Sequence, residues 1–346
     1  MTHPRMTLSG LAAAILCAML PSPSFAAKTD VVLLVNGNSI TGEIKSLDFG
    51  ALKYSTDSMG TVSIDWEDVV SATTTQTLQV EVSDGTRYFG ALNSVDHRYH
   101  VKVMTASREV TLTTAEIVRM TPIDHDESFL SSLEGSFSLG LDSEKASEVT
   151  TFNLATDVQY RTLQYLVELS ANASITNQPS EPTSQRSTIG LNYQRFRDNR
   201  WFTDWFVNWE TNQQLGIQNR YIAGGGLGRY LVQNNRNQFS LAAGLNATYE
   251  EYVDATEAST EAEGRIRVRY LHRSLLPEAY VSLTTNYYPL LANLSRYRLE
   301  SDLSIRREFI EDLFFDVTLF HSYLSDPPSG SESQDYGITT SLGYSW

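Results

Sequence analysis

The last stretch of the chain, Ser333–Trp346, reads SQDYGITTSLGYSW and decides the fold class. From Tyr336 onward, apolar side chains occupy every second position, with Thr340 in the one polar slot. They are Tyr336, Ile338, Leu342, Tyr344 and Trp346. The positions between them are small or polar: Gly337, Thr339, Ser341, Gly343 and Ser345. A period of two gives a strand one apolar and one polar face, so this stretch is predicted to be an amphipathic β-strand.

The same alternation recurs upstream, from Phe129 to the end of the chain. It is found in twelve segments: 131–142, 148–161, 163–174, 186–197, 200–211, 218–231, 237–250, 262–272, 278–288, 294–307, 312–322 and 334–346. Each segment is long enough for a tilted strand to cross a bilayer, which takes about 9–11 residues. Single-chain bacterial barrels have an even number of strands. We therefore predict an all-β chain in which residues 129–346 form a twelve-stranded antiparallel transmembrane β-barrel.

The connectors between these segments alternate between short and long. Asp198-Asn199 and Asn234-Asn235 are short, whereas 177–185 and 325–333 are long and polar. Outer-membrane barrels have short periplasmic turns and longer external loops, so both ends of the barrel domain are predicted to face the periplasm. The short turn at Pro289–Asn293, where an external loop is expected, does not follow the alternation.

The predicted inward faces carry charged side chains in register. Six arginines and four carboxylates are assigned to the lumen: Arg265, Arg267, Arg269, Arg296, Arg298, Arg306, Glu168, Asp204, Glu210 and Asp316. Unpaired charge is costly in an apolar core, whereas a lumen with water or ion pairs tolerates it. Two interpretations remain open: a basic track for small anionic solutes, or an ion-pair network that fills and stiffens a closed barrel. Twelve strands enclose little space, which favours the network.

The overall composition excludes one class of partner. The 346 residues include 26 Lys+Arg and 41 Asp+Glu, a net charge of −15. Nucleic-acid binding needs a basic surface, so nucleic acid is not an expected partner. After residue 26, no apolar run approaches the ~20 residues of a membrane-spanning helix.

Residues 1–26 have the pattern of a secretory signal peptide. Arg5 precedes an apolar run from Leu8 to Leu20, and Ser24-Phe25-Ala26 places small residues at the cleavage positions. A membrane anchor is disfavoured because the run is short. Cleavage would remove Cys17, the one cysteine, so the mature chain is predicted to lack disulfides and thiolate chemistry.

Residues 28–120 contain an internal repeat with a period of 48, in copies at 28–72 and 77–120. Val35-Asn36-Gly37 recurs as Ser83-Asp84-Gly85, and both are predicted hairpin turns. Copies of this length with several short strands predict SH3-like or Sm-like β repeats in a periplasmic module, followed by a linker at 121–128. Two separate barrels and one intertwined body both remain open. The module could bind peptidoglycan, a periplasmic protein or the barrel's own mouth.

No catalytic or metal-binding set emerges from the sequence. His97 and His100 are three apart, which predicts opposite faces of one strand, and no zinc set is formed. Outer-membrane phospholipases use a Ser-His-Asn site, but His321 has only Ser322 beside it, and His272 is predicted at a periplasmic strand end. We therefore predict no enzymatic activity, no metal and no cofactor.

Two motifs carry a resemblance to known proteins. The closing strand, with Leu342, Tyr344 and Trp346, resembles the terminal assembly signal of outer-membrane barrels. Together with the Gly-rich run YIAGGGLGRY at Tyr221–Tyr230, it makes residues 129–346 similar to the YdiY-type family of salt-induced outer-membrane proteins, whose function is unknown. The resemblance implies an outer-membrane barrel in a Gram-negative bacterium, with residues 27–128 in the periplasm.

The sequence as a whole also predicts partners and a class of function. The expected partners are outer-membrane lipid, lipopolysaccharide and the barrel-assembly machinery. The expected role is envelope-structural or stress-related and not enzymatic, with a narrow passive channel for small anionic solutes as the alternative.

Overall fold

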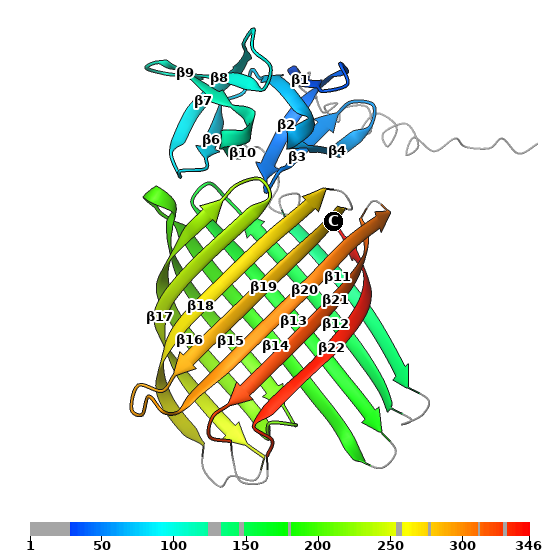
Figure 1. Ribbon diagram of the computed structural model, residues 1–346, viewed down its shortest axis with the longest axis vertical. Helices are drawn as coiled ribbons and strands as arrows, with labels where there is room; N and C mark the ends of the chain where they lie inside the picture. The colour runs from blue at the N-terminus through cyan, green and yellow to red at the C-terminus, as the bar shows by residue number, and fades with distance from the viewer. Residues whose placement is uncertain are drawn as a thin grey trace, which may run out of the picture.

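The computed structural model describes residues 28–123, 133–144, 149–178, 181–253, 258–275, 278–310, 312–327 and 331–346. The predicted signal peptide, with Cys17, lies outside these residues, as does most of the predicted linker. Two bodies are visible: an N-terminal module, residues 28–123, and a long barrel below it (Figure 1). Among the described residues, no helix is long and apolar enough to cross a membrane.

The barrel is closed and consists of twelve antiparallel strands, each paired with its neighbours in chain order. Their bounds are β11 Leu133–Glu144, β12 Val149–Arg161, β13 Tyr165–Gln178, β14 Glu181–Phe196, β15 Trp201–Asn212, β16 Ile217–Gln233, β17 Asn237–Tyr252, β18 Ser259–Leu275, β19 Glu278–Pro289, β20 Tyr297–Ile310, β21 Leu313–Leu324 and β22 Gln334–Ser345. The predicted fold class is confirmed, because each predicted segment overlaps one of these strands. β22 pairs back to β11 and closes the cylinder.

The outward face of the barrel is apolar, with aromatic side chains near both ends. Leu245 and Val207 are examples of large apolar residues exposed on the outside. Near the end far from the module, Tyr287, Tyr297 and Tyr323 form a chain of ring contacts with centroids 5.4 and 5.8 Å apart. Near the module, Tyr160, Tyr165 and Tyr193 form another, at 6.1 and 5.6 Å. Two aromatic belts around an apolar band are typical of membrane-spanning barrels.

The N-terminal module is built from the two sequence repeats. The first contains β1 Asp30–Leu34, β2 Ser39–Asp48, β3 Ala51–Thr56, β4 Gly60–Asp65, the short helix η2 Trp66–Asp68 and β5 Val69–Thr73. The second contains β6 Leu78–Val82, β7 Arg87–Ser94, β8 His100–Thr105, β9 Glu109–Thr113, η3 Thr114–Glu116 and β10 Ile117–Pro122. The elements correspond one to one at a spacing of 48 residues. Gly37 and Gly85 have φ of 84° and 87° in the predicted hairpin turns.

The two repeats form one body with a single core. The last strand of the second copy, β10, pairs with β2 of the first, and the sheet continues as β4-β3-β2-β10-β6-β7-β8-β9. Buried side chains from both copies pack in one cluster, including Leu47, Trp66, Val80 and Val103. The indole nitrogen of Trp66 donates to the carbonyl oxygen of Thr114 across the junction, at 2.7 Å. Of the two arrangements that the sequence left open, the structure has the intertwined one.

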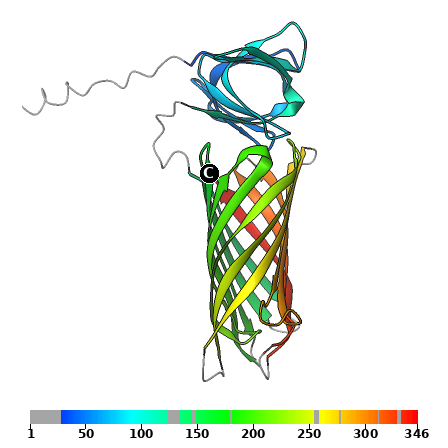
Figure 2. The ribbon, with the colours of Figure 1, turned by 90° about the vertical axis from the view of Figure 1, so that its left-hand side faces the viewer.

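The module lies over one end of the barrel (Figure 2). The C-terminus lies at this same end, which we call the module end (Figure 1). The connectors at this end are short, and longer connectors lie at the far end, at 253–258, 290–296 and 325–333. Two predicted lengths are wrong, because β13 and β14 are separated by 179–180 alone and the hairpin between β19 and β20, expected to be short, spans 290–296. This hairpin is held by backbone hydrogen bonds from Arg296 to Asn293 and from Leu290 to Arg296, both of 2.9 Å.

Candidate functional site in the lumen and at the barrel mouth

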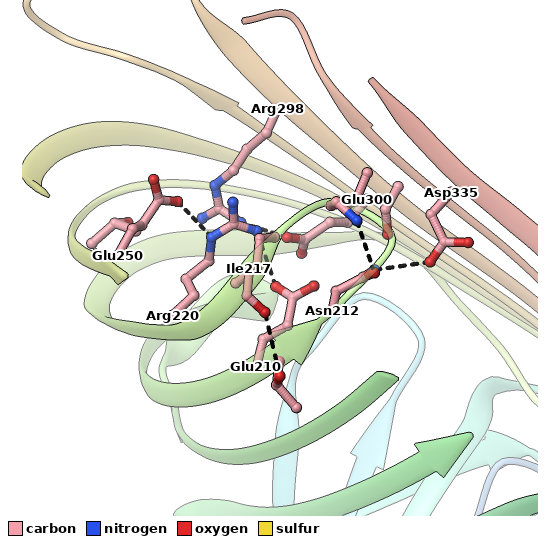
Figure 3. Close-up of polar contacts among 12 residues, drawn as sticks. Glu210, Asn212, Ile217, Arg220, Glu250, Arg298, Glu300 and Asp335 are labelled. Atoms are coloured by element: carbon pink, nitrogen blue, oxygen red, sulfur yellow. Dashed lines mark hydrogen bonds and ion pairs between the residues drawn. The ribbon is translucent and has the colours of Figure 1, made fainter. Parts of the chain in front are cut away.

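The barrel lumen contains a cluster of charged side chains near its far end. Arg220 of β16 lies between Glu210 of β15 and Glu250 of β17, its neighbours in the strand register. The Nε atom of Arg220 is 2.5 Å from Glu250 Oε1, and its Nη1 atom is 3.1 Å from Glu210 Oε2 (Figure 3). Only 2% of the Arg220 surface is exposed. The three side chains form one buried acid–base–acid triad.

A second cluster lies beside it and is centred on Arg298 of β20. Its guanidinium donates twice to Glu263 of β18, at 3.0 Å each, and also pairs with Glu300. The ring of Tyr288 lies under the guanidinium, with its centroid 3.6 Å from the Cζ atom. The hydroxyl of Thr248 donates to Glu263 at 2.6 Å. This arginine is satisfied by carboxylates on one side and by an aromatic face on the other.

Further ion pairs lie closer to the middle of the barrel. Asp204 of β15 is fully buried and pairs with Arg265 and with Arg267, the latter at 3.1 Å. Arg269 pairs with Glu168 of β13 at 3.2 Å. The aligned arginines of β18 therefore face carboxylates across the lumen. A salt bridge of 3.7 Å joins Arg306 to Asp316 on the neighbouring strands β20 and β21.

One predicted lumen residue, Arg296, precedes β20 and belongs to the far-end hairpin, where it pairs with Glu261 at 3.0 Å and with Asp326 at 2.9 Å. The predicted segment 294–307 begins too early, because the strand begins at Tyr297. The side chain of Arg296 nevertheless lines the same far-end cavity as Arg220 and Arg298. The sequence reading also missed Arg220, whose alternation with the outward Tyr221 could have revealed it.

Part of the lumen is open to water. Asp157 of β12, Asn172 of β13 and Asp302 of β20 face inward by the strand alternation and are nevertheless solvent-exposed. These strands lie on the side of the barrel where β22 meets β11. The opposite side, around β15 to β18, is filled by buried groups such as Asp204 and Phe206. The lumen is thus packed on one side and accessible on the other.

Ion pairs also join the module to the barrel mouth. Arg273 at the end of β18 pairs with Asp65 at 2.7 Å, and Arg236 in the β16–β17 turn donates to Glu67 at 2.5 Å. Lys53 of the module pairs with Glu134 of β11. A neutral hydrogen bond of 3.0 Å runs from the Asn235 amide to a module backbone carbonyl. The contacts come from several turns around the mouth.

A cation–aromatic stack lies under the module. Arg119 of β10 pairs with Asp48 at 3.0 Å and with Glu81 at 3.2 Å, and it approaches the ring of Phe196 at the end of β14. Arg161 of β12 covers the same ring at 4.7 Å and lies 3.4 Å from Asp48. Burial alone would raise the pKa of Asp48, but attraction from Arg119 and Arg161 lowers it below its ordinary value. The ionised form of Asp48, in the module, is therefore stabilised in part by Arg161 of the barrel.

The histidines that the structure describes do not form a site with neighbouring carboxylates. His97 precedes β8, and its ring makes an edge contact with that of His100, with centroids 6.1 Å apart. The prediction that they lie on opposite faces of one strand is wrong, because His97 is in the preceding turn. His272 is hydrogen-bonded to Asn237 at 2.9 Å at the module end. Among the described residues, no group of three or more His, Cys, Asp and Glu could hold a metal ion.

The residues predicted as an assembly signal lie at the seam of the barrel. The exposed outer side chains are Leu342 and Tyr344 of β22 and Trp346, which directly follows this strand. The backbones of Trp346 and Gly135 exchange two hydrogen bonds of 3.0 and 3.2 Å. The last residue therefore takes part in closing the cylinder.

Comparison with known proteins gives a family and three distant structures. No curated protein matches the chain. The β domain of the Bordetella autotransporter BrkA has 10% identity and a TM-score of 0.32, covering 62% of this chain and 98% of that one. CdiB from Acinetobacter baumannii has 8% identity and a TM-score of 0.27, covering 78% and 59%. A structure from work on in-meso crystallization of membrane proteins has 10% identity and a TM-score of 0.31, covering 62% and 83%.

These TM-scores are too low to support any inference about this chain. The family comparison is of a different kind, because it covers most of the barrel. Residues 138–346 match the family described as "Protein of unknown function, DUF481". The chain belongs to the DUF481 family.

Proposed function

We propose that this protein is a non-enzymatic, envelope-structural component of the bacterial outer membrane, with its N-terminal module in the periplasm. The apolar outer face between two aromatic belts supports a place in a bilayer. Closing the sheet into a cylinder also pairs its first and last strands, whose backbone polar groups would find no hydrogen-bond partners in hydrocarbon. The short turns under the module support the periplasmic orientation, because outer-membrane barrels have their short turns on that side.

The observation that carries the structural role is the neutralisation of the lumen arginines. Arg220 is held by two carboxylates, and Arg265 and Arg267 converge on Asp204. Arginines that are paired and buried cannot present a free positive track to a passing anion. The module over the mouth adds a second barrier. Both features favour a stiff, closed barrel over an anion channel.

Conductance of the purified mature protein in planar bilayers tests this proposal. We expect no stepwise openings from the wild-type protein, and none from an Arg267→Gln variant. A steady wild-type conductance whose ion selectivity changes in Arg267→Gln would refute the closed barrel and support the channel. Insertion is verified separately by the shift in gel mobility between unheated and boiled samples.

A narrow passive channel is the second candidate. The observation in its favour is the solvent-exposed surface of Asp157, Asn172 and Asp302 inside the barrel. Two of these three are acidic, so a pore along this side would favour cations over the anions expected from the sequence. The sign of the reversal potential in a salt gradient distinguishes the two selectivities.

The proposed stress-related function is based on the sequence resemblance. A stress-related function of the salt-induced type predicts that the amount of protein rises when cells are moved to high salt. A constant amount in quantitative immunoblots would refute it. The proposed partners are outer-membrane lipid, lipopolysaccharide and the assembly machinery, with peptidoglycan or a periplasmic protein at the outer face of the module.

A further inference from the structure

An apolar groove lies on the outer wall of the barrel, in the half nearer the module. It has a volume of about 540 Å³ and crosses the neighbouring strands β16 to β19 (Figure 1). Its lining residues are Val232, Asn237, Phe239, Val268, Tyr270 and Leu283. They face outward by the strand alternation, and all but Asn237 are apolar or aromatic. The groove is therefore open to the medium that surrounds the barrel.

The end of the groove next to the module carries a polar cluster. The Oδ1 atom of Asn237 accepts one hydrogen bond from the hydroxyl of Tyr270 at 2.8 Å and another from Nδ1 of His272 at 2.9 Å. The rings of Tyr270 and His272 are nearly parallel, with 13° between their planes. The side-chain amide nitrogen of Asn237 makes no hydrogen bond to any described residue. Its two N–H groups are thus available to a ligand.

Arginine side chains on the outer wall are confined to the same end of the barrel. In the described strands, Arg195, Arg229 and Arg307 face outward by the alternation, and each lies within the last five residues of its strand. No carboxylate in the described part of the chain pairs with any of them. An unpaired charge beside an apolar surface is costly, so these cations favour an anion from outside the chain.

Arg229 is the outward arginine on the strand at the edge of the groove. It lies opposite Leu241 in the strand register, and Leu241 in turn lies opposite Val268 of the groove. Neighbouring strands are about 4.8 Å apart, so the backbones of Arg229 and Val268 are about 10 Å apart. The guanidinium of Arg229 lies over the ring of Trp201 at 5.5 Å, and its Nε atom is buried without a hydrogen-bond partner in the described structure.

We propose that the groove binds one anionic glycerophospholipid of the membrane leaflet at the module end. An acyl chain lies against Phe239, Val268 and Leu283, the ester and glycerol oxygens accept hydrogen bonds from the Asn237 amide, and the phosphate pairs with Arg229. Trp201 and Tyr270 support this depth, because such side chains lie at the head-group level of a bilayer. The inference rests on the proposed membrane location and adds the lipid class, the leaflet and the site.

Photolabelling in vesicles tests the site. The mature protein is reconstituted in phosphatidylcholine vesicles with a trace of phosphatidylglycerol or of phosphatidylethanolamine that carries a diazirine on its acyl chain, and the adducts are mapped by mass spectrometry. We expect the phosphatidylglycerol probe to label Phe239 and Leu283 about fivefold more than the phosphatidylethanolamine probe, which is the preference that one arginine gives to an anionic lipid at a membrane surface. Both probes should label the outward Leu245 equally.

Two variants and a matched control separate the two parts of the site. Arg229→Gln should remove the preference for phosphatidylglycerol and leave labelling by phosphatidylethanolamine unchanged. Val268→Trp fills the groove and should reduce the labelling of Leu283 by both probes. Arg195→Gln is the matched control, because it removes an outward arginine at the same end of the barrel but two strands away from Arg229, and it should keep the preference. The gel-mobility shift of folded barrels confirms that each variant has inserted.

Three outcomes decide the proposal. Equal labelling of Phe239 and Leu283 by the two probes in the wild-type protein would overturn it, because lipid without selectivity only fills the surface. A loss of preference in Arg195→Gln as large as that in Arg229→Gln would also overturn it, since it indicates diffuse surface charge. A lack of adducts on Leu245 as well as in the groove would instead refute the proposed membrane location.

Discussion

Replacing Arg220 with methionine should strongly destabilise the barrel. The substitution removes the one cation between Glu210 and Glu250, whose carboxylates lie on either side of it in a site that is almost closed to water. Breaking a buried ion pair by removing one partner costs about 3–5 kcal/mol, because the remaining charge is left without compensation. Here two carboxylates are left, so the upper part of this range is expected. At about 1.4 kcal/mol per tenfold, the unfolding equilibrium should shift by roughly a thousandfold.

The assay is urea unfolding of the barrel in lipid vesicles, followed by tryptophan fluorescence. Arg296→Met is the matched control, because its ion pairs with Glu261 and Asp326 are more exposed than those of Arg220, and exposed ion pairs contribute only about 0–1 kcal/mol. A triple variant with Glu210→Gln and Glu250→Gln added should recover most of the lost stability, since neutral groups can replace a buried ionic cluster at little cost.

Two results would refute this reasoning. The first is a loss for Arg220→Met no larger than that for the exposed control. The second is a triple variant as unstable as the single one, which would indicate that packing and not charge accounts for the loss.

Four other predictions concern the module and the seam. Replacing either Glu67 or Arg236 with a residue of the opposite charge should loosen the module, which is measured as faster proteolysis of the linker. Swapping both residues should restore protection, and equal protection in all variants would contradict the ionic contact. The hydrogen bond from Arg236 lowers the pKa of Glu67 below 4.5. The ion pair should therefore stabilise docking of the module above pH 4.5, and this stabilisation should be lost as the pH falls through the lowered pKa. Glu67→Gln should abolish this pH dependence. Trp66→Ala should destabilise the module by about 3–5 kcal/mol in thermal unfolding, a value that a loss below 1 kcal/mol would contradict. Deleting Trp346 removes the hydrogen bonds to Gly135 and should slow barrel folding in vesicles, whereas an unchanged rate would show that this contact forms late.

The sequence predicts the strands well because the alternation is local. The apolar and polar faces of β22 and β18 can be assigned from neighbouring residues without any knowledge of their partners. The predicted strand at 294–307 begins too early because Leu294 extends the alternating pattern into a turn that only the backbone hydrogen bonds reveal. Strand boundaries are set by such turn contacts, which hydrophobic periodicity does not encode.

The triad and the merged module could not be predicted in the same way. Glu210 and Glu250 meet Arg220 only when the register of three strands is known, and register depends on long-range pairing. Likewise, the pairing of Met120 with Leu47 joins segments that the repeat pattern alone would assign to separate bodies. A periodic sequence identifies the units but not how they are combined.

The shared core of the N-terminal module has a consequence for its origin. Because β10 of the second copy pairs with β2 of the first and joins the two halves of one sheet, one copy alone leaves a sheet edge and half of the core exposed to water. A 48-residue ancestor could have hidden that surface only by associating with an identical molecule. Tandem duplication would then have fused a symmetric dimer into a single polypeptide, which removes the entropic cost of bringing two subunits together. Each half could afterwards diverge, and the side that now covers the barrel could acquire its charges without altering the other.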